Sequence, residues 1–236
     1  MSYIDVNSGQ VIAQADGSTR QLFIKKTYLH LAAAIALFAL VETVMIQAGL
    51  GNAALKLLSV SQWAWLGVLV VYGIASNLIH RWALTAFSIE KQYAAWFAGI
   101  VIEAVIFLPM IALATMYSAD LLQHAAVVTM ALVVGLTAIV FTTGKDFSFL
   151  RPALTIGFFI ALGVIVASLI FGFSLGLFFS GAMIVFAAGA ILYETSQIQH
   201  HYHESQYVGA SLSLFSSVGL LFWYVLQFLM AFAGND

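Results

Sequence analysis

The sequence predicts an all-α membrane protein, a bundle of seven transmembrane helices. Of its 236 residues, 63% are hydrophobic and only 8% are charged, whereas about 25% of the residues in a soluble domain are charged. Seven apolar stretches approach the length of about 20 residues that spans a bilayer as a helix. Backbone polar groups in lipid must hydrogen bond within their own segment, so these stretches are helices rather than isolated strands.

The seven stretches divide the chain into a tail, a membrane domain and a short end. We predict spans over residues 27–48, 63–79, 92–110, 121–141, 152–170, 175–196 and 207–232. Residues 1–26 form a polar tail without the apolar core of a cleavable signal peptide, so the first helix would act as its own insertion signal. Residues 27–232 form the membrane domain, and residues 233–236 form a short C-terminus.

Local signals mark several helix ends. Asp120 and Gln123 have the spacing of a capping box that opens the fourth helix, and Gly144 can end that helix in a left-handed conformation. Pro152 falls in the first turn of the fifth helix, where proline is tolerated. Pro109 is expected to kink or stop the third helix.

The basic residues predict the orientation of the bundle. Cytoplasmic loops of membrane proteins carry the excess of lysine and arginine. Only Lys56 lies on one side of the predicted spans, while the other basic residues share the opposite side: Arg20, Lys25, Lys26, Arg81, Lys91, Lys145 and Arg151. We therefore expect a bacterial inner-membrane protein with the tail and the loop at 197–205 in the cytoplasm and the C-terminus on the periplasmic side.

Composition and motifs argue against several functions. A net charge of −2 offers no basic surface for nucleic acid, and the absence of cysteine excludes disulfides and thiolate metal sites. The Thr-Thr-Gly-Lys run at 142–145 lacks the earlier glycine of a phosphate-binding loop, because Ile139 stands there. The run at 209–213 is not a nucleophile elbow, because Ser213 stands where glycine is needed. We expect neither an enzyme nor a cofactor.

The acid Glu194, near the end of the sixth span, is the first candidate site. A carboxylate at the centre of a membrane helix costs about 2.5–3.5 kcal/mol on insertion scales. Thr195 follows Glu194, and the seventh helix carries small and polar residues at Gly209, Ser213 and Ser217, which share one face. An acid among hydroxyl groups can hold a proton or a hard cation such as Ca²⁺. The alternative is a helix-end acid that contacts headgroup water and His200.

Two further acids lie inside apolar spans. Glu103 lies about eleven residues into the third predicted helix, near the midplane of the bilayer. Such a group points toward a partner or a water-filled cavity, or is a protonated acid that serves packing. Glu42 lies nearer the outer end of the first helix and can reach the interface.

The loop after the sixth span contains His200, His201 and His203 with Glu204. Imidazole is a ligand for Zn²⁺, and His200 and Glu204 lie one helical turn apart, which leaves a metal site open. The alternative is a solvated loop that gains positive charge beside Glu194 as the pH falls, and so responds to protons.

Three motifs resemble the Bax inhibitor-1 family, in its bacterial YccA-like branch. They are Thr-Thr-Gly-Lys-Asp-Phe-Ser-Phe-Leu at 142–150, Ala-Ile-Leu-Tyr-Glu-Thr-Ser at 190–196 and Ala-Ser-Leu-Ser-Leu-Phe at 210–215. The resemblance implies a seven-helix bundle whose last helix is surrounded by the other six. It also implies a pH-sensitive Ca²⁺ leak, gated by two acids on the last two helices. The first acid maps onto Glu194, whereas the second position holds Ser217, so the pair is incomplete here.

The same resemblance implies a partner. Members of the YccA-like branch are similar to modulators of the membrane protease FtsH, which engages an N-terminal cytoplasmic tail. Residues 1–20 would be such a tail, flexible and exposed, or a leader without a partner. We therefore hold two hypotheses. One is a cation leak with Glu194 at the gate, assisted by Ser217, Glu103, Ser213 and Thr195. The other is a non-catalytic protease modulator in the lipid bilayer.

Overall fold

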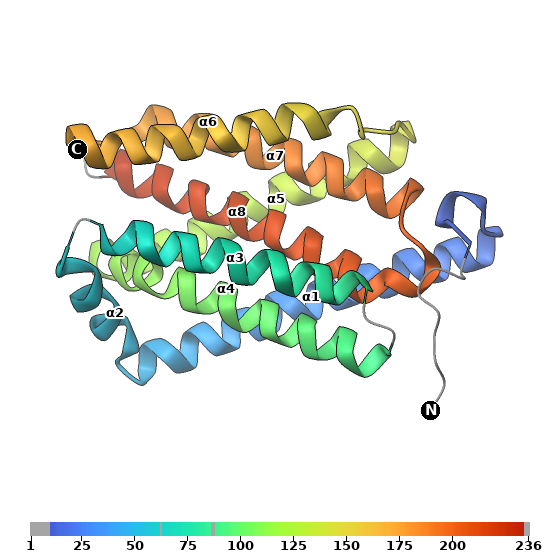
Figure 1. Ribbon diagram of the computed structural model, residues 1–236, viewed down its shortest axis with the longest axis horizontal. Helices are drawn as coiled ribbons and strands as arrows, with labels where there is room; N and C mark the ends of the chain where they lie inside the picture. Colours follow the sequence, from blue (N-terminus) through green and yellow to red (C-terminus); the bar gives the residue numbers. More distant parts are fainter. Residues whose placement is uncertain (1–9, 62, 86–87, 234–236) are drawn as a thin grey trace.

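The computed structural model describes residues 10–61, 63–85 and 88–233. In these residues, seven helices are long and apolar enough to cross a membrane, as predicted. They are α1 (Gly17–Gln47), α3 (Ala64–Thr85), α4 (Ile89–Tyr117), α5 (Ala119–Thr143), α6 (Leu150–Phe171), α7 (Gly176–His200) and α8 (Tyr207–Ala233). Figure 1 shows them running roughly parallel and antiparallel along the long axis of the molecule.

A short helix was not predicted. Helix α2 (Leu50–Ser59) lies between α1 and α3 at the end of the bundle opposite the N-terminal segment (Figure 1), and it packs against α4 and α1. Gly49 precedes it with a φ of 76°, a left-handed conformation in which glycine carries no steric penalty. Ten residues are too few to span a bilayer, so α2 covers the end of the bundle.

The structure corrects several predicted helix ends. Helix α1 begins at Gly17, where the Asp16 side chain accepts hydrogen bonds from the backbone N–H groups of Ser18 and Thr19. Ser118, and not Asp120, caps α5. Pro109 lies inside α4, which continues to Tyr117.

Two other local signals are confirmed. Gly144 ends α5 with a φ of 61°. Pro152 lies in the first turn of α6, which begins at Leu150.

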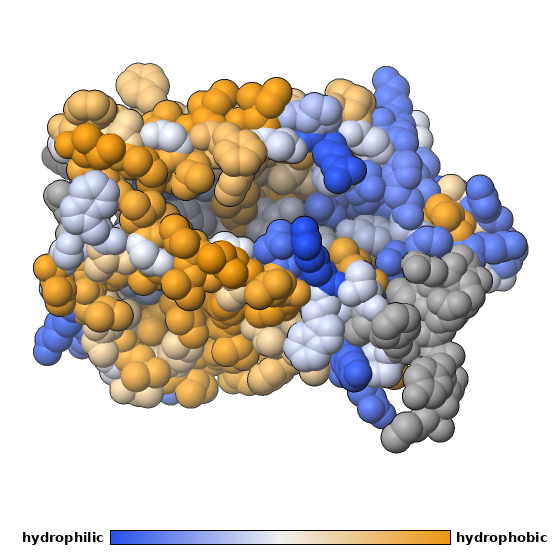
Figure 2. Space-filling view, in the orientation of Figure 1, coloured by the Kyte–Doolittle hydropathy of each residue, from blue (hydrophilic) through white to orange (hydrophobic). Residues whose placement is uncertain are grey.

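The surface of the bundle divides into an apolar part and a polar end. Many large apolar side chains are exposed along the helices, among them Leu40, Val71, Phe159 and Phe178. Figure 2 shows apolar residues covering most of the visible face, while hydrophilic residues gather at the end that holds the N-terminal segment. This is the distribution expected when lipid surrounds the helices and water meets the polar end.

Helix α8 forms the centre of the bundle. It packs against α1, α3, α4, α5 and α7, and its side chains Leu212, Leu214, Leu221 and Leu226 are fully buried. Helix α6 packs mainly on α7, so the arrangement differs from the one that the resemblance implies. Five long helices surround α8, while α6 lies outside them, next to α7 (Figure 1).

The segment before α1 is held against the bundle. Ile12 is 0% exposed, and its backbone N–H donates a hydrogen bond of 2.9 Å to the carbonyl of Tyr202. Val11 pairs with His203 as an isolated β-bridge. The expectation of a flexible, exposed tail over residues 1–20 is therefore wrong for its second half. Residues 1–9 of that tail lie outside the described residues.

Candidate functional site

Glu194 lies where α7 meets α8. Tyr202 follows α7, and its hydroxyl donates a hydrogen bond of 3.1 Å to Glu194 Oε2. The same hydroxyl interacts with the side chain of Ser213 on α8. Burial and the neighbouring Glu194 carboxylate raise the pKa of Tyr202 well above its ordinary value. Tyr202 therefore stays neutral and acts as a hydrogen-bond donor to the acid.

The residues beside Glu194 face other partners. The His200 ring bonds through Nδ1 to the carbonyl of Ser196 at 3.0 Å, so the partner of Glu194 is Tyr202 and not His200. Thr195 is fully buried and lies beside Tyr28 of α1. Thr195 therefore points toward α1 and away from the contact between Glu194 and Tyr202.

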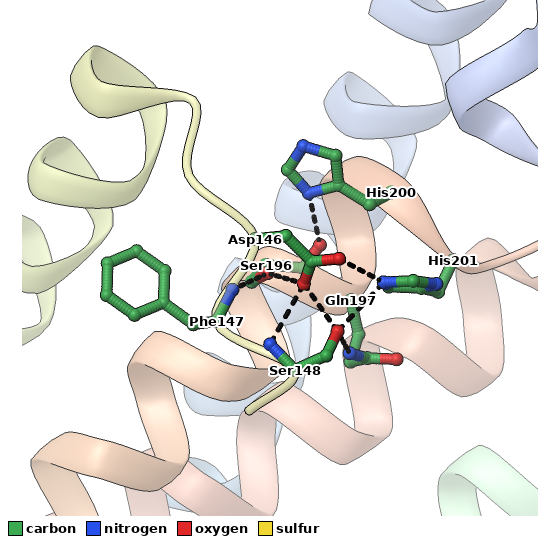
Figure 3. A network of polar contacts seen from close by, with 7 residues as sticks. All are labelled: Asp146, Phe147, Ser148, Ser196, Gln197, His200 and His201. Carbon is green, nitrogen blue, oxygen red and sulfur yellow. Dashed lines mark hydrogen bonds and ion pairs between the residues drawn. The ribbon is translucent and has the colours of Figure 1, made fainter. Parts of the chain in front are cut away.

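A network of polar contacts joins the loop before α6 to the end of α7 (Figure 3). Asp146 Oδ2 lies 2.9 Å from His201 Nε2. Ser196 Oγ donates to Asp146 Oδ1 at 3.2 Å and accepts from the backbone N–H of Phe147 at 2.8 Å. Ser148 donates to Asp146 through both its backbone N–H and its hydroxyl. Two of the three motifs that suggested the family thus meet in this network.

The sequence analysis did not identify Asp146 as a site residue. The hydrogen bond from the Ser148 side chain is the main cause that lowers the pKa of Asp146, and His201 contributes. The Asp-x-Ser spacing, which is typical of a side chain that bonds backbone two residues on, could have marked it. Asp146 is therefore ionised at neutral pH and fixes the loop to α7.

The histidines after α7 have separate partners. His201 contacts Asp146, and the backbone of His203 pairs with Val11 and with the side chain of Gln206. In the described ranges, no group of three or more histidine, aspartate, cysteine or glutamate side chains could hold a metal ion. The structure therefore gives the metal interpretation of this loop no support.

Glu103 is the second buried acid. It is 3% exposed, and the Tyr72 hydroxyl of α3 donates to its Oε2 at 2.5 Å. A Cβ atom at Gly219 of α8 would lie 2.7 Å from Glu103 Oε1. Glycine at that position therefore lets the carboxylate approach the backbone of the central helix. Glu103 also lines a cavity of about 320 Å³ between α3, α4 and α8, together with Tyr72 and Ser217.

A line of hydroxyl groups on α8 connects the surroundings of the two acids. Ser213 lies beside Tyr202 and thus near Glu194, and it accepts through its carbonyl a hydrogen bond of 3.2 Å from Ser217 Oγ. Ser217, one helical turn or about 6 Å further on, lines the cavity of Glu103.

Gly209 does not continue this line toward Glu194. It packs against Ala83 and Leu84 of α3, where an added Cβ would lie 2.6 Å from Leu84 Cδ2. The predicted polar face of the last helix therefore serves helix packing at its first position and the two acids only from Ser213 onward.

Glu42 is placed differently from the prediction. It is 4% exposed in α1, so its side chain does not reach the interface. Neither of its carboxylate oxygens hydrogen bonds to another described residue. The expectation that this acid extends to the membrane surface is wrong.

Comparison with known proteins gives a match along most of the chain. A family model described as inhibitor of apoptosis-promoting Bax1 matches residues 20–234. The chain is 27% identical over 229 residues to protein lifeguard 4 of Mus musculus, an alignment that covers 96% of this chain and 92% of that protein.

Two bacterial relatives are more similar over shorter stretches. The chain is 44% identical over 103 residues to an uncharacterized protein, PA2604, of Pseudomonas aeruginosa, covering 43% of this chain and 46% of the relative. It is 38% identical over 101 residues to the modulator of FtsH protease YccA of Escherichia coli K12, covering 42% and 45%. The chain thus spans about half the length of these two relatives.

Proposed function

The chain belongs to the Bax inhibitor-1 family, and from this premise we propose that it is a membrane protein that lets cations, Ca²⁺ among them, leak along α8. Glu194 is the gate of the proposed path at its cytoplasmic end. Ser213 and Ser217 lead from the gate to Glu103 at mid-membrane depth. Thr195, which faces α1, has no direct part in the path.

The arrangement of two buried acids around α8 is the observation that carries this proposal. Carboxylates inside a membrane protein are costly and mark ion or proton pathways. Ca²⁺ and other hard cations bind oxygen ligands. Glu194 and Glu103 both lie against α8, and the side chains of Ser213 and Ser217 occupy the helix between them. This order of oxygen atoms supports a path for a hard cation.

The contact between Tyr202 and Glu194 suggests how the path closes. The Tyr202 hydroxyl occupies one oxygen of Glu194, and the Tyr202 backbone is held by Ile12. A cation that uses Glu194 must displace this hydroxyl. Charging of the loop that contains His200, His201 and His203 at lower pH would change the field beside Glu194, which gives the proposed gate its dependence on pH.

Flux through liposomes tests the proposal. Purified protein in liposomes loaded with a Ca²⁺ indicator should pass Ca²⁺ faster than empty liposomes do, and Glu194→Gln should lower or change that flux. Glu204→Gln is the matched control, because Glu204 is an exposed acid of the same loop. Flux equal to that of empty liposomes would end the proposal.

The name of one bacterial relative favours a second function, a non-catalytic modulator of a membrane protease of the FtsH type. Residues 11–14 pack on the loop between α7 and α8, so a partner at the cytoplasmic end would meet both segments together. Deleting residues 1–9 leaves this packed segment and the Asp16 cap in place. If the tail recruits the protease, the deletion should abolish association in a pull-down from membranes, and unchanged association would count against the tail.

A further inference from the structure

We propose that the cavity between α3, α4 and α8 binds a small organic cation, an ammonium group, held by the Glu103 carboxylate and surrounded by aromatic rings. The cavity of about 320 Å³ falls at the lower end of the range of small-molecule pockets. The site stands whether or not cations cross the membrane, because a bound ligand is measured without a gradient.

The charge of the cavity points to a cation. Among the described residues, Tyr72 is the only side chain that hydrogen bonds Glu103. No lysine, arginine or histidine nitrogen in this part of the chain lies within 4.0 Å of the Glu103 carboxylate. A buried carboxylate without a basic partner is costly. Its countercharge must therefore come from a proton or from a bound cation.

The walls of the cavity distinguish an organic cation from a metal ion. Trp65 and Trp223 are stacked with their ring centroids 5.6 Å apart, and the Phe107 ring meets Trp223 edge-on at 5.0 Å. Aromatic faces attract ammonium groups, most strongly those with methyl substituents. Ca²⁺ instead needs six to eight oxygen ligands, whereas the polar groups of this cavity are one carboxylate, the Tyr72 hydroxyl and two serines.

The fold fixes the acid in this position. Gly219 leaves room for Glu103 Oε1 beside α8, and Tyr72 holds the other oxygen. Ser216, at the edge of the same cavity, bonds His80 Nε2 at 3.2 Å, while His80 Nδ1 bonds the carbonyl of Ser76 at 2.8 Å. The His80 ring therefore faces serine partners, and the carboxylate remains the charged ligand of the cavity.

Tetramethylammonium is the probe for the test. Full-length protein in maltoside micelles is titrated with tetramethylammonium chloride against NaCl at equal ionic strength, and tryptophan fluorescence reports Trp65 and Trp223. We expect a saturable change that NaCl does not produce. Glu103→Gln, which keeps the shape of the side chain, should weaken binding at least about tenfold, as loss of a charged ligand implies.

Matched variants keep the test decisive. Glu42→Gln removes the other buried acid of the apolar region and should leave binding unchanged. Tyr72→Phe keeps the carboxylate and should still bind, which covers the case in which Glu103→Gln fails to fold. No saturable signal with tetramethylammonium, equal affinity in Glu103→Gln, or saturation by Ca²⁺ alone would overturn the proposal.

The ammonium group can come from a free amine or from a lipid headgroup. The same titration in nanodiscs of phosphatidylglycerol and of phosphatidylcholine separates these sources. Competition by phosphatidylcholine supports a headgroup ligand, and equal binding in both lipids supports a free cation. Loss of binding in both lipids, with the protein folded, contradicts the site in a membrane.

Discussion

At the scale of single residues, Tyr202 stands where the family resemblance implies a second acid. The resemblance maps that acid onto Ser217, but Ser217 lines the cavity of Glu103, and Tyr202 is the hydrogen-bond donor to Glu194. A neutral hydroxyl does not repel the carboxylate, whereas a second acid would. The gate of this chain is therefore expected to depend on a hydrogen bond rather than on a proton shared by two acids.

The variant Tyr202→Phe tests this contact. It removes the donor to Glu194 while keeping the ring, so Ca²⁺ flux into liposomes should rise, and thermal stability should fall by about 1 kcal/mol for the lost hydrogen bond. Tyr117→Phe, at an exposed tyrosine near the opposite end of the bundle, is the control. Unchanged flux in Tyr202→Phe would show that this hydroxyl does not close the path.

The pair of Asp146 and His201 predicts a pH dependence of stability. Hydrogen bonds from Ser148 and the contact with His201 hold the pKa of Asp146 below its ordinary value. A carboxyl with a lowered pKa stabilises the folded state above its unfolded pKa of about 4, and this contribution is lost as the pH falls further.

Unfolding of Asp146→Asn measures that contribution. Because the pair is about half exposed, we expect a loss of under about 1 kcal/mol at pH 7. The difference from the wild type should shrink as the pH falls below about 4. A difference that grows on acidification would contradict the assignment.

Gly219 makes a further prediction at this scale. In Gly219→Ala the new methyl group would lie 2.7 Å from Glu103 Oε1, so the carboxylate or α8 must shift. Overpacking of this kind costs about 1–3 kcal/mol, and thermal unfolding in detergent should show it. Gly163→Ala in α6, where nothing lies within 4 Å of the added atom, should be neutral or stabilising.

At the scale of elements, apolar length predicts the spans and misses what lies beyond the hydrocarbon. The first turns of α1 contain Arg20, Lys25 and Lys26 and fall outside a hydrophobic window, so the Asp16 cap was the only signal of its true start. Helix α2 has too few residues to span the membrane. Glu42 looked accessible by its depth along α1, yet packing buries it, and no pattern in the sequence shows such packing.

The N-terminal segment gives a prediction at this scale. Ile12→Ala removes a buried side chain that anchors residues 11–14, so hydrogen exchange at the Ile12 amide, which bonds the Tyr202 carbonyl, should become faster. Gln14→Ala changes an exposed residue of the same turn and should leave exchange unchanged. Equal protection in both variants would mean that the Ile12 side chain does not hold the segment.

At the scale of the whole molecule, the sequence predicts most of the architecture. Mean hydropathy and the spacing of polar breaks suffice for the number of spans, because lipid imposes one length on every helix. The position of α6 outside α7 could not be predicted, since helix order in space depends on how side chains fit one another. The sites show the same division. Glu103 and Glu194 were visible as isolated acids, whereas Tyr202 and Asp146 gain their roles only through contacts across the fold.

Orientation remains a prediction, and the absence of cysteine makes it simple to test. Single cysteines can be introduced at Gln14 and at Ser59, which are exposed at opposite ends of the bundle. An impermeant thiol reagent added to intact cells should label Ser59→Cys and spare Gln14→Cys until the membrane is permeabilised. Labelling of Gln14→Cys alone in intact cells would reverse the orientation inferred from the basic residues.

The central place of α8 has a consequence for biosynthesis. A chain leaves the ribosome from its N-terminus, so the helix that ends on the axis of the bundle is the last one to be made. The earlier spans must therefore wait in the bilayer in a loose arrangement that leaves the axis vacant. Until α8 arrives, Glu194 and Glu103 lack the neighbours that surround them here. The unfinished protein is then a target that membrane quality control can distinguish from the finished one.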